Sequence, residues 1–409
     1  MTALADAVLP LIRTRSEVYR WGVANHHGRQ MHDAIDLLEA ALPTTAPAEA
    51  YKVTNAALAS AIKVIARADD SSGIIGDACR RLLELHPKVA AAAQVAPGKL
   101  VDWMMKFQFD GDVDYFDIDL VAYAPALGDV GMKAYRQRVA EVRASLGPEA
   151  PASEYWSAPH QHERWLLDRI DQRLAVLDRD VDAIIRTHVR DRKVAAWFQE
   201  TAEALEEIGE FDLAIDWARQ ATDFGTGHQS LKAGGYWCQL LAAHRPAEHL
   251  AARLEVFRRW PSSSTAAALY PATGSAWSDF EEEVTARLTA QPRDAVLFSL
   301  LTLKDARRAW EQAHALRLAD DDVWAELIKV YERTDPLAVL PAHRRLVEHQ
   351  LLQTDATNYR KAAKRLATMR KLAAGTEQAV EVDAFIAALR ETHRRRPRLQ
   401  QEFDQARLP

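Results

Sequence analysis

One stretch limits the possible folds more than any other. Residues 195–226 form two amphipathic segments joined by a tight turn at Gly209. Apolar residues recur every three or four positions in both segments, as they do along one face of an α-helix. They are Ala196, Phe198, Ala202, Leu205 and Ile208 in the first segment, and Phe211, Ala214, Ile215, Ala218 and Ala221 in the second. One such helix pair cannot cover its own apolar face, so we expect further helices on both sides of it.

This pair resembles one tetratricopeptide unit, a helix–turn–helix of about 34 residues. Gly209, Phe211, Ala214 and Ala221 match the turn glycine, the aromatic residue after it and two small helix-packing positions of that pattern. We predict an all-α protein. The resemblance further implies a right-handed superhelical array of helix pairs, a tetratricopeptide-like α-solenoid, whose groove binds another molecule.

The remaining sequence keeps the helical period and shows no sustained alternation of the kind that indicates strands. The composition changes once, where residues 147–159 become rich in Pro, Ala and Ser. We therefore predict an N-terminal helical domain at 1–147, a linker or docked loop at 148–162, and a helical-repeat domain at 163–409.

Residues 163–189 carry apolar side chains at alternating spacings of three and four, which predicts one long helix. These side chains are Leu167, Ile170, Leu174, Leu177, Val181 and Ile184. The helix would pack lengthwise within its own chain or pair two copies of it, so monomer and homodimer both stay open.

Charge and cysteine content exclude several classes of protein. The net charge of −6, from 52 basic and 58 acidic residues, provides no general attraction for nucleic acid. Cys79 and Cys238 form neither a disulfide framework nor a zinc site, and we expect two buried free thiols. The N-terminus lacks the basic region of a signal peptide, and no apolar run is long enough to cross a bilayer. We expect a cytoplasmic protein with no membrane partner.

The C-terminal segments 359–375 and 382–403 resemble the helical region that accompanies SWIM zinc fingers in bacteria, and related uncharacterised all-helical proteins. Residues that carry the resemblance include Tyr359, Leu366, Met369, Phe385, Leu389 and His393, and residues 123–139 are similar to a motif of the same group. The Cys-x-Cys and Cys-x-His pairs of the finger are absent from the sequence. Zinc-dependent recognition is therefore not expected here.

Two clusters contain residue types that bind metal ions. Residues 109–120 contain Asp110, Asp112, Asp114, Asp117 and Asp119, and carboxylates spaced in this way can converge on Ca²⁺ or Mg²⁺. The Gly and Glu of an EF-hand loop are missing, so we expect a solvated loop whose aspartates cap a helix and turns, and we keep Asp110, Asp112 and Asp114 as metal candidates. His26, His27 and His32 have poor spacing for a metal on one helix face. We expect them to be surface or capping residues, with His26 and His27 in a polar segment between two helices.

The only dense basic run contains Arg394, Arg395, Arg396 and Arg398. These residues are candidates for phosphate contacts, although basic residues also complement the dipole at a helix C-terminus. No specific catalytic motif is present, and we assign neither catalytic residues nor a cofactor. Most of the eleven Trp residues should fill gaps between helices, and a few should line a groove.

The leading functional hypothesis is a non-enzymatic helical-repeat scaffold that binds a protein or peptide partner. One alternative is a metal-dependent enzyme or ion-binding protein that uses the Asp110–Asp119 segment. A second alternative is nucleic-acid binding through the C-terminal arginines.

Overall fold

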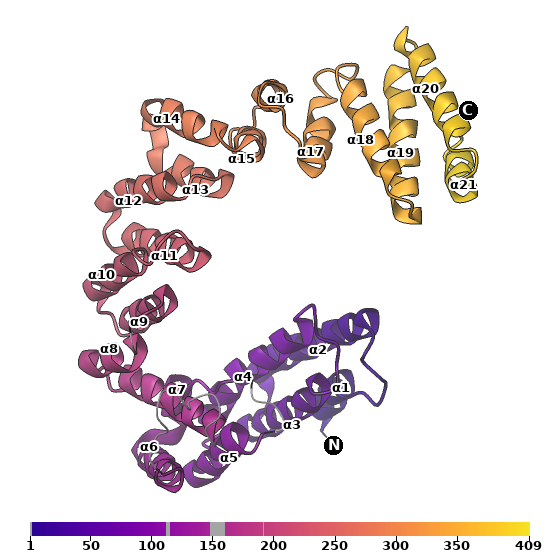
Figure 1. Cartoon of the computed structure of the whole chain (residues 1–409). Helices are drawn as coiled ribbons and strands as arrows, with labels where there is room; N and C mark the ends of the chain where they lie inside the picture. Colours follow the sequence, from indigo (N-terminus) through magenta and orange to yellow (C-terminus); the bar gives the residue numbers. More distant parts are fainter. Residues whose placement is uncertain (1, 112–114, 148–159, 191) are drawn as a thin grey trace. The chain divides into compact units, whose positions relative to one another are not determined.

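The computed structural model describes residues 2–111, 115–147, 160–190 and 192–409, and these residues are overwhelmingly helical (Figure 1). Within this described part the only β pairing is a single bridge between Val18 and Ala68. The all-α prediction is therefore confirmed. None of the described helices combines the length and the apolarity that crossing a membrane requires.

The chain divides into two compact units, residues 1–217 and residues 218–409, and the division falls within one helix, α10. The helices of the first unit are α1 (Ala3–Ile12), α2 (Trp21–Ala41), α3 (Pro47–Ile65), α4 (Ile74–Ala92), α5 (Pro97–Phe109), α6 (Leu120–Ser145), α7 (Gln161–Leu177), α8 (Val181–Val189), α9 (Ala195–Glu207) and the start of α10 (Phe211–Ala221). The predicted linker, 148–162, lies almost entirely outside the described residues, so that domain boundary stays a prediction. The helices on either side of it, α6 and α7, pack on each other.

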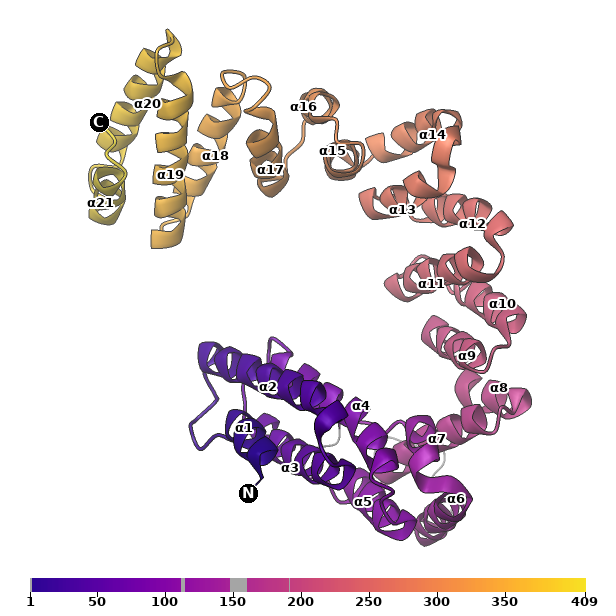
Figure 2. The same cartoon turned by 180° about the vertical axis from the view of Figure 1, so that it is seen from behind.

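In the first unit, helices α1 to α4 pack together around one apolar core, with α1 beside α2 and α3, and α4 beside α2 and α3 (Figures 1 and 2). A second core joins α4 to α7. From α5 onward, each helix packs mainly on the helices next to it in the chain, and this neighbour-to-neighbour packing continues through α9.

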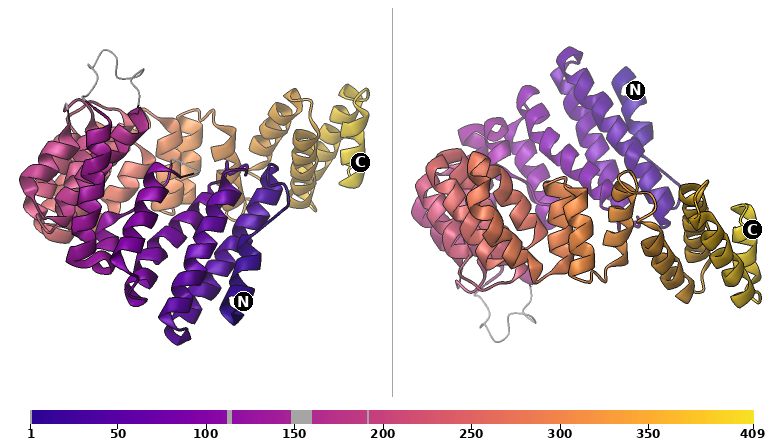
Figure 3. Two further views of the ribbon diagram at one scale, coloured as in Figure 1. Left: turned by 90° about the horizontal axis from the view of Figure 1, so that it is seen from below. Right: turned by 90° about the horizontal axis from the view of Figure 1, so that it is seen from above.

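The second unit contains α11 (His228–His244), α12 (Pro246–Arg259), α13 (Ser263–Thr273), α14 (Trp277–Thr289), α15 (Pro292–Leu297), a π-helical turn (Phe298–Thr302), α16 (Ala306–Ala315), α17 (Asp321–Tyr331), α18 (Leu340–Leu352), α19 (Ala356–Ala373), α20 (Gln378–Thr392) and α21 (Pro397–Gln405). Here too, most helices pack on their neighbours in the chain, although α21 packs on α19. The orange-to-yellow helices α18 to α21 (Figure 3) contribute to one core.

Short polar residues begin many of these helices. The carboxylates of Asp180, Asp320 and Asp355 each accept hydrogen bonds from backbone N–H groups in the following first turn. Such N-caps satisfy donors that have no partner inside the helix. Ser262 and Thr265 make a reciprocal capping box at α13.

The predicted helix pair at 195–226 is present, as α9 and α10 joined at Gly209. Gly209 has a φ of +86°, a left-handed conformation that glycine adopts without steric cost. Ala214 is fully buried, as its place in the pattern predicts. A second glycine, Gly128, has a φ of +56° and kinks α6.

The prediction of one long helix at 163–189 is wrong. The chain breaks after Leu177, because Arg179 takes a left-handed conformation with φ of 55° and Asp180 caps a new helix. The two halves, α7 and α8, pack on each other. The apolar spacing of three and four therefore runs across a turn, and it marks two short core-facing stripes.

Candidate functional site

The Asp-rich segment joins α5 to α6, and the structure places three of its five aspartates. Asp110 is exposed and follows the last turn of α5. Asp112 and Asp114 lie outside the described residues. Asp117 and Asp119 lie immediately before α6, and the Asp119 carboxylate accepts a hydrogen bond from the Val121 N–H at 3.2 Å. The expectation that these aspartates cap the next helix is confirmed for Asp119.

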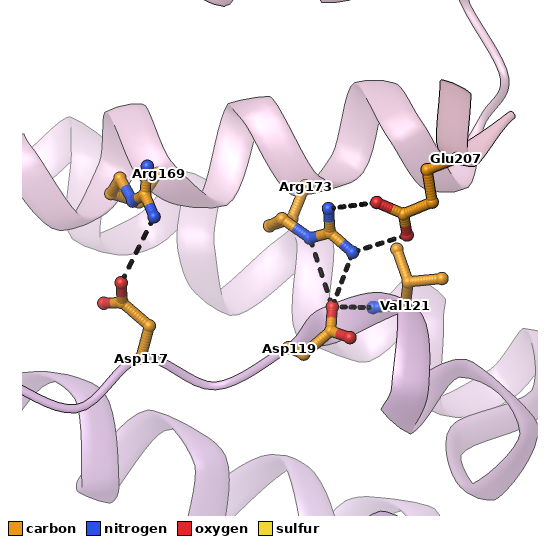
Figure 4. Close-up of polar contacts among 6 residues, drawn as sticks. All are labelled: Asp117, Asp119, Val121, Arg169, Arg173 and Glu207. Atoms are coloured by element: carbon orange, nitrogen blue, oxygen red, sulfur yellow. Dashed lines mark hydrogen bonds and ion pairs between the residues drawn. The ribbon is translucent and has the colours of Figure 1, made fainter. Parts of the chain in front are cut away.

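Two arginines of α7 point towards this segment (Figure 4). The Arg173 guanidinium donates to Asp119 Oδ1 through Nε at 3.1 Å and through Nη2 at 2.7 Å. It also donates to both carboxylate oxygens of Glu207, from α9, at 2.8 Å each. Arg173 thus ties the start of α6, the middle of α7 and the end of α9 together.

Arg169, one helical turn earlier, makes a looser contact of 3.4 Å with Asp117 (Figure 4). Both side chains of this pair are more than a third exposed, so the pair contributes little to stability. A cavity of about 310 Å³ adjoins these residues, and the apolar side chains Ile118, Leu166 and Ile170 form part of its wall.

Electrostatics support a structural role for Arg173. Burial disfavours its charge, but the hydrogen bonds that it donates to Glu207 and the negative charge of Asp119 outweigh burial and raise the pKa of the guanidinium. The carboxylates of Asp117 and Asp119 therefore already have cationic partners that would compete with a metal ion. Among the described residues, no three His, Cys, Asp or Glu side chains come close enough together to hold a metal.

The histidines 26, 27 and 32 lie within α2, so the prediction of a polar break between two helices is wrong there. His27 is buried, and its ring nitrogens contact the Ile12 carbonyl at 3.0 Å and Gln30 at 3.3 Å. His32 contacts the Ile74 carbonyl at 3.1 Å. The ring nitrogens of these two histidines have protein partners and hold α2 against α1 and α4.

The C-terminal arginines lie around the turn between α20 and α21. Arg394 pairs with Glu391, and Arg398 pairs with the buried Glu402 at 2.6 Å. Arg396 donates to the Leu351 carbonyl, from α18, at 2.8 Å. Arg395 is exposed. Three of the four candidates for phosphate contacts therefore have partners within the chain.

A second cavity, which sequence reasoning did not single out, opens between α3 and α5. It has a volume of about 420 Å³, and Leu58, Ile62, Trp103 and Phe107 form its apolar wall. Residues of both charge signs, Lys63, Lys106 and Asp110, also line it. Trp103 and Phe107 are stacked, with ring centroids 5.3 Å apart.

His86 supports this aromatic wall from the core. Its ring stacks on Trp103 at a centroid distance of 4.2 Å, and its nitrogens contact the Tyr123 hydroxyl at 2.8 Å and the Asn55 amide oxygen at 3.3 Å. Burial lowers the pKa of His86 to about 4, so the ring is neutral at pH 7. With the Asn55 oxygen accepting from Nε2, Nδ1 accepts from the tyrosine hydroxyl. In the sequence, the only signal of this wall is the pair Trp103 and Phe107, two aromatic residues four positions apart on α5. This signal indicates neither the contact with His86 nor the contribution of α3 to the cavity.

Comparison with known families adds one finding. The model of a family of unknown function (DUF6880) matches residues 9–399. The chain belongs to this family. The match covers both compact units, the aromatic cavity and Arg173, and it supports the all-helical, uncharacterised character implied by the C-terminal resemblance. It contains no indication of a SWIM zinc finger. No curated protein matches the chain.

Proposed function

We propose that this protein is a non-enzymatic helical-repeat scaffold that binds a protein or peptide partner in the cytoplasm. The proposal includes the finer fold prediction, a right-handed array of tetratricopeptide-like helix pairs. Support comes from the α9–α10 pair with its left-handed Gly209 and from the packing of each helix on its neighbours in the chain. Buried Cys79 and Cys238, both free thiols, agree with a reducing compartment.

The observation that carries the proposal is the aromatic cavity between α3 and α5. Partners are commonly anchored by one apolar side chain in a pocket, with polar contacts around it. A cavity of about 420 Å³ with Trp103 and Phe107 on its wall can accept one large apolar side chain. Lys63, Lys106 and Asp110 offer polar contacts to the backbone that presents this side chain.

The cavity can be filled without disturbing the core, because Ala59 lines it and is exposed. We expect Ala59→Phe to occupy the anchor site and to weaken binding of partners by about tenfold or more, which corresponds to the loss of one good apolar contact. Ala40→Phe, at an exposed position of α2, is the matched control. Ligands would be selected from a random peptide library on the parent protein, and their affinities measured on both variants. Equal binding to parent and Ala59→Phe would show that the cavity is not the anchor site.

The two alternatives remain open to direct tests. Metal binding by the Asp110–Asp119 segment would have to displace Arg169 or Arg173 from Asp117 and Asp119, or use Asp110 with residues beyond the described ones. Nucleic-acid binding would have to use Arg395 and compete with the contacts of Arg394, Arg396 and Arg398. Neither alternative has an observation in its favour that equals the aromatic cavity.

A further inference from the structure

A group of incompletely paired cations lies across α17, α18 and α19 in the second unit. Asp321, in the first turn of α17, contacts His349 at 2.9 Å and Arg345 at 3.6 Å, both from α18. Arg345 also lies over Trp324, with its guanidinium carbon 4.7 Å from the ring centroid. Arg365, from α19, donates to His343 Nδ1 at 3.1 Å and has no carboxylate within ion-pair distance among the described residues.

Several polar atoms in this group are buried and have no hydrogen-bond partner. They are Asp321 Oδ1, His343 Nε2, Arg345 Nε, Arg345 Nη2, Gln350 Oε1 and Arg365 Nε, and they make up most of such atoms in the described part of the chain. Buried polar groups in native proteins usually have hydrogen-bond partners, so several unpartnered atoms in one place need a physical explanation.

The charges of these side chains show that the cluster lacks an anion. Arg345 and Arg365 share a single carboxylate, because Asp321 lies beside the first and its negative charge also acts on the second. His343 adds no charge, since burial, and then the nearby Arg365, lower its pKa to about 4. His349 lies on the other oxygen of Asp321 and competes for the same anion. Two guanidinium groups against one carboxylate leave the cluster one negative charge short.

Both guanidinium groups keep a nitrogen that a ligand can reach. Nη1 of Arg345 and Nη2 of Arg365 have no hydrogen bond within the described chain and are not buried, whereas other nitrogens of each group are cut off from water. A cation that is only partly solvated attracts an anion more strongly than a fully hydrated one. The planar guanidinium also matches a carboxylate in shape.

We propose that Arg345 and Arg365, on the packed helices α18 and α19, bind one carboxylate of an acidic peptide beside Trp324. A single carboxylate supplies the one charge that the cluster lacks, whereas a phosphate dianion would exceed it. A peptide is the source that fits best, because the Arg345 side chain is 35% exposed on α18, next to the helix that carries Arg365, so a carboxylate on a larger chain can approach it from solvent. This inference stands independently of the aromatic cavity in the first unit.

The test uses the full chain and a fluorescein-labelled hexaglutamate peptide, with affinity measured by fluorescence anisotropy. We expect Arg365→Met and Arg345→Met each to weaken binding by about tenfold, in line with the loss of a charge-assisted hydrogen bond. Arg344→Met is the matched control, because Arg344 is the neighbour of Arg345 on α18 but pairs with Glu348 and lies over Phe385. An equal loss in all three variants would mean that the peptide senses overall charge only, and would overturn the site.

Thermal unfolding separates a binding role from a structural one. If Arg365 serves a ligand, Arg365→Met leaves the melting temperature of the free protein no lower than that of Arg344→Met, because removal of an underpaired cation offsets the loss of its hydrogen bond to His343. A lower melting temperature for Arg365→Met than for Arg344→Met would assign the cluster to stability and overturn the proposal. Stabilisation by inorganic phosphate exceeding that by acetate would overturn the carboxylate assignment. Failure of both hexaglutamate and acetate to bind would overturn it as well.

Discussion

At the scale of single residues, Ala214 shows how a small side chain sets the distance between helices. It is fully buried in α10, three residues after Phe211 and five after Gly209. Ala214→Leu adds three carbon atoms to this packed position and should lower the free energy of unfolding by about 1–3 kcal/mol. Urea unfolding would measure the change. Ala251→Leu, the same substitution at an exposed position of α12, should have little effect, and equal stability of the two variants would contradict the close packing at Ala214.

His86 predicts how stability depends on pH. Its pKa is about 4 in the folded protein, lower than the ordinary 6.5, because burial disfavours the charged ring. The unfolded chain therefore binds more protons between these two values, and stability falls as the pH drops through this window. From about pH 7.5 to about pH 5, this single group should cost about 2 kcal/mol of stability.

His86→Phe isolates that contribution, because it keeps a ring against Trp103 and removes the titration. At neutral pH the variant should be less stable by about 1–3 kcal/mol, since the Tyr123 hydroxyl loses its partner. Towards acid pH the gap between parent and variant should narrow, as measured by urea unfolding across the pH range. A gap that stays constant would mean that His86 titrates normally.

At the scale of helices, Arg173 shows how one ion-pair residue can connect three elements of the first unit. It joins α6, α7 and α9 through two carboxylates and is only 27% exposed. Arg173→Met should lower the free energy of unfolding by about 1–2 kcal/mol, more than an isolated surface pair contributes. Arg136→Met is the comparison, because Arg136 makes one exposed pair with Asp178 and should cost about 0.5 kcal/mol or less. Equal losses of unfolding free energy in the two variants would show that the connection of three helices adds no stability beyond that of one exposed ion pair.

Helices were predictable from this sequence to the extent that their signals are local. The turn at Gly209 and the cap at Asp119 follow from residue type and from position beside an apolar stripe. The break at Arg179 was missed because Leu177, Val181 and Ile184 keep the heptad spacing across the turn. The aromatic cavity was missed because His86 and Trp103 come from α4 and α5, and α3 provides the opposite wall. Such contacts depend on tertiary packing, which a single sequence does not display.

At the scale of the whole molecule, the packing of helices on their sequence neighbours predicts that a destabilising substitution affects mainly the helices around it. Leu366 is fully buried in the core of α18 to α21, and Leu366→Ala should cost about 2–5 kcal/mol there. We expect hydrogen exchange to accelerate between residues 340 and 409 and to remain unchanged in α1 to α5. Faster exchange throughout the chain would instead indicate one cooperative unit.

The same neighbour-to-neighbour packing affects how the chain folds while the ribosome synthesises it. Helices that contact mainly the preceding and the following helix close only short loops when they dock, and proteins dominated by local contacts fold fast. During synthesis most helices of the second unit find a packing partner that has already left the ribosome, because that partner precedes them closely in the chain. The core that α1 to α4 form also includes Phe116, so it is complete once residue 116 has emerged, with more than two hundred residues still to be added. Translation and folding can therefore advance together, and little apolar surface has to wait for a distant part of the chain.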